Sequence, residues 1–341
     1  MAYFRKLDPQ HALPRLLDIL TREDRWLIMI NADPDALASA MALRRILIHR
    51  VHDVGIAHVN EITRPDNLAM IRLLRIPTRR FTPNVVAQFD RFALVDSQPH
   101  HHPCFDDVDF SLVIDHHPLS KDNPVRATLR EIKPDYGSVS TLFTEYLYNL
   151  GIRPGKLLAT ALLYGIKTDT HSFERPFCDV DMRAFRYLSK FADHLLLRKI
   201  VRSEFKMHWL RYFGQAFGAI RPLRRGFFIY MGEVENPDVL VILADFFMRV
   251  HEISWAVVAG VARETLVSIF RGDGLRRGMP DVGGLAAAMF GDVGSAGGHA
   301  SMARAEIPLS RLKGQDPEAF LWKRFSTNPR TMPAKGASIE L

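Results

Sequence analysis

Three apolar runs, each with an acidic residue at or just beyond its end, constrain the fold of this chain more than any other feature. The runs WLIMIN (26–31), FALVDS (92–97) and FSLVIDHH (110–117) have the length and composition of buried parallel strands. Apolar residues at helical spacing follow the first run over 36–49, and helical patterns also cover 138–150 and 156–166. Strands that alternate with helices predict an α/β fold with a doubly wound, mainly parallel sheet.

The acidic residues after these runs predict a metal site. Asp33, Asp35, Asp96, Asp115 and His116 lie at or just past the ends of predicted strands, where doubly wound sheets bind ligands. Clustered carboxylates strongly disfavour joint ionisation, and one or two divalent cations would compensate them. Mixed carboxylate and imidazole ligands suit manganese, zinc, cobalt or iron better than calcium. Each Asp taken alone fits a helix cap or a turn equally well, so the prediction rests on the joint pattern.

A second pattern of strands and helices begins at Arg225. Strands are expected at 227–232, 254–262, 265–271 and 305–309, with a hairpin turn at Arg263–Glu264 and helices at 239–250 and 282–290. We therefore predict a catalytic domain over 1–195, a helical linker over 196–224 and a smaller α/β domain with a mixed sheet over 225–315. The remaining residues, 316–341, read as a tail that is partly disordered.

The composition is that of a globular protein of about two domains. The chain has 341 residues, of which 47% are hydrophobic and 24% are charged. No apolar run approaches the ~20 residues of a membrane span, so we expect no membrane partner, and Cys104 and Cys178 fit reduced thiols in a cytoplasmic protein. The net charge of +7 favours an anionic partner, or else only keeps the protein soluble.

Taken together, these motifs resemble the DHH phosphoesterase superfamily. The resemblance rests on Asp115–His116–His117 at a strand end, on the acids 33, 35 and 96 before it, and on Thr168–Asp169–Thr170 after a helix. Gly137–Thr141 is similar to the family's Gly-Ser-x-Ser-Thr segment, and Gly297–His299 resembles the Gly-Gly-His signature of the DHH-associated C-terminal domain. Over about residues 25–310 the layout is most similar to the nanoRNase/pAp-phosphatase and cyclic-di-AMP phosphodiesterase subgroup.

The resemblance implies a metal-dependent hydrolase, with exonuclease or oligoribonuclease activity on small nucleotides. Its substrates would be short oligonucleotides, pAp-like nucleotides or cyclic or linear dinucleotides, and a homodimer is one option for its assembly. Asp33 would hold one Mn²⁺ and Asp35 the other, Asp96 would bridge both, and His116 and Asp169 would complete the second site. Asp115 and His117 would orient ligands or contact phosphate beside His116. The expected substrate contacts are Ser138, Ser140, Arg271, Gly297, Gly298 and His299, although the serines also fit helix caps and Arg271 also fits a solvated charge.

One position departs from the family pattern. Members of the nanoRNase group typically have a His where this chain has Met29, and RecJ-type members have an Asp where it has Asn31. Asn31 would be a weak, neutral metal ligand, so we expect one ion or weak occupancy of the first site. This departure motivates an alternative, a degenerate member that binds nucleotide or nucleic acid as a sensor. A pyrophosphatase or exopolyphosphatase is less favoured, because those relatives carry a different C-terminal domain.

The run His100–His101–His102 follows Asp96 closely and has two interpretations. It could reach the site, or it could be an exposed loop without a metal role. Gly-x-Gly-x-x-Gly, P-loop and Gly-x-Ser-x-Gly motifs are absent from the sequence, which argues against the common dinucleotide, nucleoside triphosphate and serine-hydrolase sites.

Overall fold

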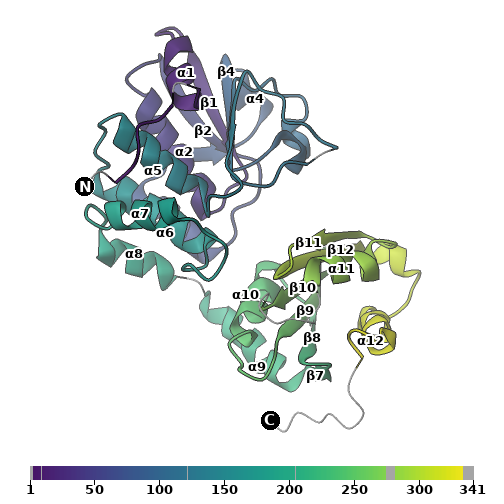
Figure 1. The fold of residues 1–341 in the computed structure, drawn as a ribbon. Helices are drawn as coiled ribbons and strands as arrows, with labels where there is room; N and C mark the ends of the chain where they lie inside the picture. Colours follow the sequence, from purple (N-terminus) through teal and green to yellow (C-terminus); the bar gives the residue numbers. More distant parts are fainter. Residues whose placement is uncertain (1–2, 9, 121, 204, 274–280, 333–341) are drawn as a thin grey trace. The chain divides into compact units, whose positions relative to one another are not determined.

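The computed structural model describes residues 3–8, 10–120, 122–203, 205–273 and 281–332. The chain divides into two compact units, residues 1–204 and residues 205–341, and each has its own sheet and its own core (Figure 1). Within the described ranges, no helix is both long and apolar enough to cross a membrane.

The first unit is built on a six-stranded parallel sheet, as the alternating pattern predicted. The strand order is β3-β2-β1-β4-β5-β6, so the chain reverses its winding direction between β1 and β4. The strands are β1 (Arg25–Ile30), β2 (Asp53–His58), β3 (Thr78–Arg80), β4 (Arg91–Val95), β5 (Leu112–Asp115) and β6 (Leu129–Ile132). Of these, β2, β3 and β6 were not predicted from the sequence.

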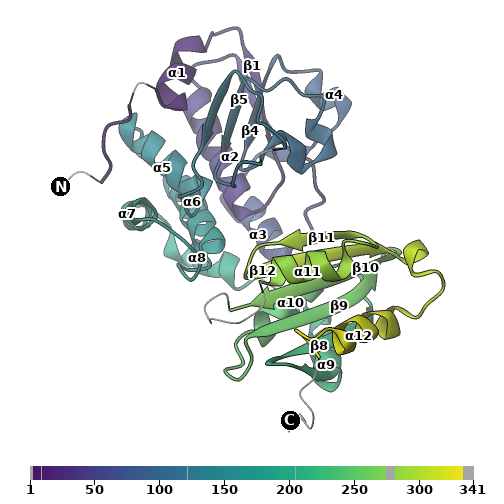
Figure 2. The same ribbon diagram turned by 45° about the vertical axis from the view of Figure 1, so that its right-hand side comes forward.

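Helices and loops cover both faces of this sheet. Along β1, Trp26 and Ile28 pack into one core while Leu27 and Met29 pack into the other, which explains why the strand is apolar throughout. Helices α2, α5 and α6 lie side by side (Figure 2). The helices of this unit are α1 (Ala12–Ile19), α2 (Pro34–Leu47), α3 (Pro65–Leu74), α4 (Pro83–Val86), α5 (Val139–Asn149), α6 (Lys156–Asp169), α7 (Asp179–Leu188) and α8 (His194–Val201), with short 3₁₀ turns η1 (Pro99–His101) and η2 (Pro103–Phe105).

The second unit contains the predicted mixed sheet. Its strand order is β11-β12-β10-β9-β8-β7, with β8 and β9 parallel and the other pairs antiparallel. The strands are β7 (Ile220–Leu223), β8 (Gly226–Glu233), β9 (Trp255–Ala262), β10 (Thr265–Gly272), β11 (Ser295–Gly298) and β12 (Met302–Pro308). Strands β9 and β10 form the predicted hairpin, and Arg263 and Glu264 at its turn both have positive φ (46° and 62°), the geometry of a type I′ turn.

Two layers of helices cover the second sheet. One core includes residues of α9 (Leu210–Gly218) and α10 (Asp238–Phe247), and the other includes residues of α11 (Val282–Phe290) and α12 (Pro317–Thr327). The 3₁₀ turns η3 (Met207–Trp209) and η4 (Leu309–Leu312) complete the unit.

Two segments differ from the prediction. Residues 196–224 are not a linker, because most of α8 packs in the first unit through the fully buried Ile200, whereas α9 and β7 belong to the second. Residues 317–327 are not part of a tail, because α12 buries Leu321 and Phe325 completely. Only two apolar side chains of α12 are fully buried, so its sequence shows little periodicity. Residues 333–341 of the predicted tail lie outside the described residues.

Candidate metal centre

The candidate centre lies at the carboxyl ends of three neighbouring strands. Asp33 and Asp35 follow β1, Asp96 follows β4, and Asp115 ends β5. Because these strands are parallel and adjacent, the residues after them reach the same edge of the sheet. The last residue of α6, Asp169, joins them from a helix that contacts α2. The predicted convergence of these side chains is therefore present in the structure.

Four of these side chains form a compact group. Asp35, Asp96, His116 and Asp169 each offer a ligand atom, and these atoms lie within 4.8 Å of one another. His116 Nε2 lies 3.2 Å from Asp169 Oδ2 and 3.6 Å from Asp96 Oδ1. Three carboxylates and one imidazole match the ligand chemistry of manganese, zinc or iron.

Asp35 is completely buried in the first turn of α2. Its carboxylate accepts hydrogen bonds from Val139 N (2.6 Å) and Ser140 N (2.8 Å), at the N-terminus of α5. Burial, reinforced by the charge of the nearby Asp169, raises the pKa of Asp35 to about 7. The helix N-terminus fixes this carboxylate but does not compensate its charge fully.

Asp96 is held in an unfavourable state that a cation would relieve. Its backbone has a positive φ of 58°, which non-glycine residues rarely adopt. In the described part of the chain its buried Oδ1 has no hydrogen-bond partner. Burial, together with the charges of Asp33 and Asp35, raises the pKa of Asp96 well above its usual value. An orphaned carboxylate oxygen facing His116 fits a metal ligand, so the residues present suit a divalent cation.

The orientation of His116 suits metal ligation. Its Nδ1 lies 3.0 Å from Tyr136 O, and a carbonyl only accepts, so Nδ1 carries the proton and donates it. The neutral ring then presents the Nε2 lone pair to Asp96 and Asp169. Without a cation the ring is charged instead: burial acts to lower the pKa of His116, but the hydrogen bond and charge of Asp169 outweigh it and raise the pKa to about 10.

Asp115 and His117 form a pair beside this group. His117 Nδ1 donates to Asp115 Oδ1 (2.8 Å), and Gln98 Nε2 donates to Asp115 Oδ2 (2.8 Å) and to His117 O (3.0 Å). Burial acts to raise the pKa of Asp115, but the hydrogen bonds from His117 and Gln98 and the charges of His117 and His116 together outweigh it and hold the pKa below its usual value. His117 also joins Asp96 and His116 in a second, three-residue group with ligand atoms within 4.8 Å. The role of this pair, as orienters of ligands or as phosphate contacts, stays a prediction.

The predicted first metal site is not assembled in the same way. Met29 is completely buried in the core opposite α2, and Asn31 is exposed. Asp33 caps α2 by accepting from Ala36 N (2.9 Å), the cap alternative that its sequence position had left open. Among the described residues, Asp33 belongs to no group of three or more His, Cys, Asp or Glu side chains that could hold a metal ion.

The predicted substrate contacts are divided between the two units. Ser138 is completely buried and caps α5 by accepting from Thr141 N (3.2 Å), and the Ser140 side chain is completely buried as well. Arg271 is neither free nor solvated, because its Nε donates to Asp245 Oδ1 (2.5 Å) and its side chain is 14% exposed.

Gly297, Gly298 and His299 lie at the end of β11. Gly298 has a φ of +150°, and a Cβ there would overlap Met302 O, so the close approach of β12 requires glycine. His299 is exposed, and its backbone N donates to Met302 O (2.7 Å).

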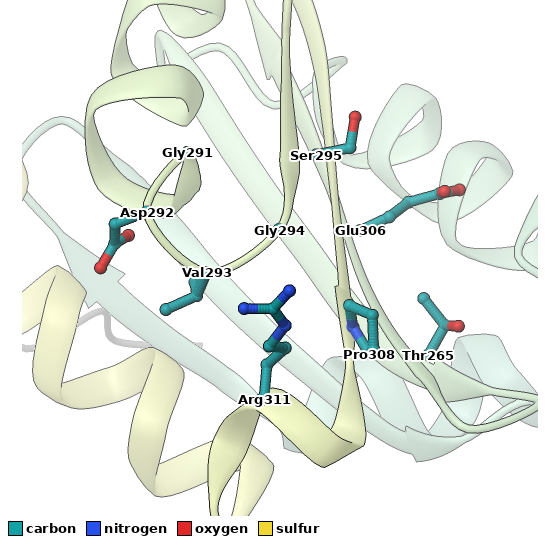
Figure 3. A pocket seen from close by; sticks show the side chains of 9 residues that line it. All are labelled: Thr265, Gly291, Asp292, Val293, Gly294, Ser295, Glu306, Pro308 and Arg311. Atoms are coloured by element: carbon teal, nitrogen blue, oxygen red, sulfur yellow. The ribbon is translucent and has the colours of Figure 1, made fainter.

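A hollow in the second unit lies at the other end of β11. It has a volume of about 430 Å³, and Arg311 projects into it beside Val293 and Pro308 (Figure 3). Its two carboxylates are already ion-paired, Asp292 with Arg324 and Glu306 with Arg304. This hollow does not coincide with the predicted Gly-Gly-His contacts.

Three residues near the centre were not predicted from the sequence. Gln98 and Asp181 are buried polar residues without a motif, and Gly165 lies in the middle of α6. The only sequence signal for Gln98 was its distance of two residues from Asp96. Of the histidine run, His101 packs edge-on against His117, with ring centroids 5.4 Å apart, so this loop does reach the neighbourhood of the site.

Fold and site together define an α/β protein with a candidate metal centre at the carboxyl edge of a parallel sheet. Residues 25–166 match the DHH family, N-terminal domain. The chain therefore carries a DHH-family domain, and the candidate ligands Asp35, Asp96 and His116 all lie within the matched residues.

One relative by sequence is an uncharacterized protein of Methanocaldococcus jannaschii, 31% identical over 293 residues. The match covers 85% of this chain and 59% of the relative, so the chain spans less than two thirds of that protein's length.

Solved structures with similar folds include an exopolyphosphatase-related protein from Bacteroides fragilis, with a TM-score of 0.73 and 15% identity, covering 92% of this chain and 95% of that one. RecJ from Thermus thermophilus, solved in complex with Mn²⁺, has a TM-score of 0.50 and 16% identity and covers 96% of this chain and 56% of that one. At these identities the likeness concerns the fold.

Proposed function

We propose that this chain is a metal-dependent phosphoesterase that hydrolyses phosphate esters of small nucleotides or short oligonucleotides. The observation that carries the proposal is the buried Asp96 carboxylate, whose Oδ1 has no hydrogen-bond partner among the described residues and which lies beside Asp35, Asp169 and His116. A cation bound by these four residues would lower the pKa of a bound water and polarise a phosphoryl oxygen. Mn²⁺ is the cofactor we favour, in keeping with the donor set and with the metal in the RecJ structure.

The chain's own residues would perform three tasks at this centre. Tyr136 O keeps the proton of His116 on Nδ1, so that Nε2 remains available as a ligand. Asp115 keeps the proton of His117 on Nδ1 in the same way, which leaves the other ring nitrogen of His117 to interact with a phosphate or with a cation. The N-terminus of α5 holds Asp35 at a fixed position.

The substrate class is inferred from the motifs and from the positive charge of the chain. The Gly-Gly-His segment and the excess of Arg and Lys favour an anionic substrate with a terminal phosphate. We expect hydrolysis of 5′-phosphorylated dinucleotides and pAp, with nucleoside monophosphate or inorganic phosphate as a product.

Incubation of the full chain with labelled dinucleotides and with pAp, with Mn²⁺ and with a chelator, tests this function. We expect Mn²⁺-dependent turnover that Asp96→Asn lowers at least a hundredfold, because losing a ligand shared by the site removes charge that compensates the cation. Asp107→Asn is the matched control, since Asp107 is an exposed Asp on the loop after η2. Absence of turnover on every one of these substrates would count against the proposal.

A second candidate function follows from Met29 and Asn31. Because a buried Met replaces a typical imidazole ligand, a protein that binds nucleotide without hydrolysing it is the alternative. Inert wild-type protein that binds nucleotide without added metal would favour this alternative. Turnover that is lost in Asp96→Asn would exclude it.

A further inference from the structure

We propose that Asp181 is a positioning residue that sets the metal affinity of the candidate centre through Asp35. This inference rests on the proposed function, since it concerns the same cation. Asp181 lies in the first turn of α7, outside the residues that match the DHH family, and was not predicted from the sequence.

Asp181 is completely buried and anchors the turn that precedes α5. Its Oδ2 accepts from Gly137 N (2.9 Å), Cys178 N (2.8 Å) and Cys178 Sγ (3.2 Å), and its Oδ1 accepts from Thr141 Oγ1 (2.5 Å). Two of these four donors lie on Gly137 and Thr141, which are 44 and 40 residues earlier in the chain. A buried carboxylate with this many directed donors fixes its partners firmly, because each lost contact leaves a buried polar group unsatisfied.

The anchored turn is the one that holds Asp35. Between Gly137 and Thr141, the backbone N–H groups of Val139 and Ser140 donate to the two carboxylate oxygens of Asp35. Gly137 and Thr141 are thus hydrogen-bonded to Asp181, whereas Val139 and Ser140, which lie between them, are hydrogen-bonded to Asp35. A shift of this turn would rotate or release a candidate ligand.

The turn has little room to relax. A Cβ on Gly137 would lie 2.7 Å from Thr170 Cγ2 and 3.1 Å from Asp181 Oδ2. Thr170 directly follows Asp169, another candidate ligand. The turn is therefore packed between Asp181 and the end of α6.

A purely structural role is the competing explanation. Asp181 also accepts from Cys178 N at the start of α7, as an acidic residue in a capping box does. If capping were its whole role, its loss would lower stability and leave the metal affinity of the folded protein unchanged. Metal affinity measured on folded protein separates the two explanations.

The first test compares Asp181→Asn with Asp179→Asn in the full chain. Asn presents an NH₂ group where the carboxylate accepts, so one of the four donors must be turned away. Asp179 lies on the same helix turn, but its side chain is 81% exposed and pairs with Arg183 on the same helix (2.9 Å). Mn²⁺ titration by electron paramagnetic resonance should show a dissociation constant at least tenfold higher for Asp181→Asn, as expected when a group that supports a ligand is lost. The dissociation constant of Asp179→Asn should not change.

The second test remains informative if Asp181→Asn does not fold. Thr141→Val removes the hydroxyl that donates to Asp181 but keeps the branched shape, whereas Thr141→Ser keeps the hydroxyl. We expect Val to weaken Mn²⁺ binding and Ser to restore it to the wild-type value. Equal affinities for Val, Ser and wild type would overturn the inference. If the wild type binds Mn²⁺ and every variant binds it with the same affinity, this inference alone is wrong. If the wild type binds no Mn²⁺, the proposed function is wrong as well.

Discussion

At the residue scale, His116 determines how the metal-free protein responds to pH. Its pKa rises from 6.5 to about 10 in the fold, because its interactions with Asp169 outweigh the effect of burial. A pKa that is higher in the folded state stabilises the protein below the unfolded value, and this stabilisation is lost as pH rises through the folded value. The window for His116 is therefore pH 6.5 to 10, with stability falling as pH increases.

We expect the chelator-treated protein to unfold at lower urea concentration at about pH 9 than at about pH 7. The raised pKa of Asp35 acts in the same direction at lower pH, between its unfolded value of 3.8 and about 7. Urea unfolding curves over this pH range, with and without Mn²⁺, measure the effect. His116→Asn should flatten the slope above neutral pH, whereas His49→Asn, at an exposed position, should not. A stability that rises steadily over the same interval without metal would contradict the ion pair of His116 with Asp169.

Gly165 shows how little space surrounds Asp35. A Cβ at this position of α6 would overlap Ser140 Oγ and lie 2.9 Å from Asp35 Oδ1. Gly165→Ala should therefore destabilise the fold by about 1–3 kcal/mol through overpacking, despite the better helix propensity of Ala, and should weaken Mn²⁺ binding. Gly214→Ala in α9 is the matched control, because a Cβ there meets no atom within 4 Å. It should leave Mn²⁺ binding unchanged and stabilise the fold by up to about 1 kcal/mol. Calorimetry and Mn²⁺ titration of the two variants check both effects.

At the scale of elements, the sequence predicted those strands and helices whose apolar residues follow a regular period. The central strands β1, β4 and β5 were evident because a parallel strand buried on both faces is apolar at every position. Short strands such as β3 carry no such signal, since Thr78–Arg80 is half-buried or exposed.

The sequence predicted the candidate metal ligands but not the residues that support them. The candidate ligands follow predicted strands or a predicted helix, so topology alone brings them together. Gln98 and Asp181 were not predictable, because their importance depends on hydrogen bonds between segments that lie 17 and 44 residues apart. For Arg271 the sequence left a substrate contact or a solvated charge open, and the ion pair was not predictable because its partner Asp245 lies 26 residues away on another element.

Gln98 joins the ends of β4 and β5 into one unit. Its Nε2 donates to both Asp115 and the His117 carbonyl, and the side chain is completely buried. Gln98→Met keeps the length of the side chain but leaves these acceptors unsatisfied, which should cost about 1–3 kcal/mol in the free energy of unfolding. Gln88→Met, at an exposed position before β4, should change it by less than about 0.5 kcal/mol. Equal urea midpoints for the two variants would show that the Gln98 bridge contributes nothing to stability.

At the scale of the whole molecule, the two units have separate cores, and every candidate metal ligand lies in the first. A fragment of residues 1–204 should therefore fold alone and bind Mn²⁺ with the affinity of the full chain. A fragment that ends at residue 195, the boundary suggested by sequence, removes most of α8 and with it Ile200, whose burial alone contributes about 1.5–3 kcal/mol. It should unfold at lower urea concentration than the longer fragment. Circular dichroism during urea titration compares the stabilities, and Mn²⁺ titration compares the sites. If the 1–204 fragment is folded but no longer binds Mn²⁺, residues of the second unit must complete the centre, and the four-residue group would be insufficient as a metal site.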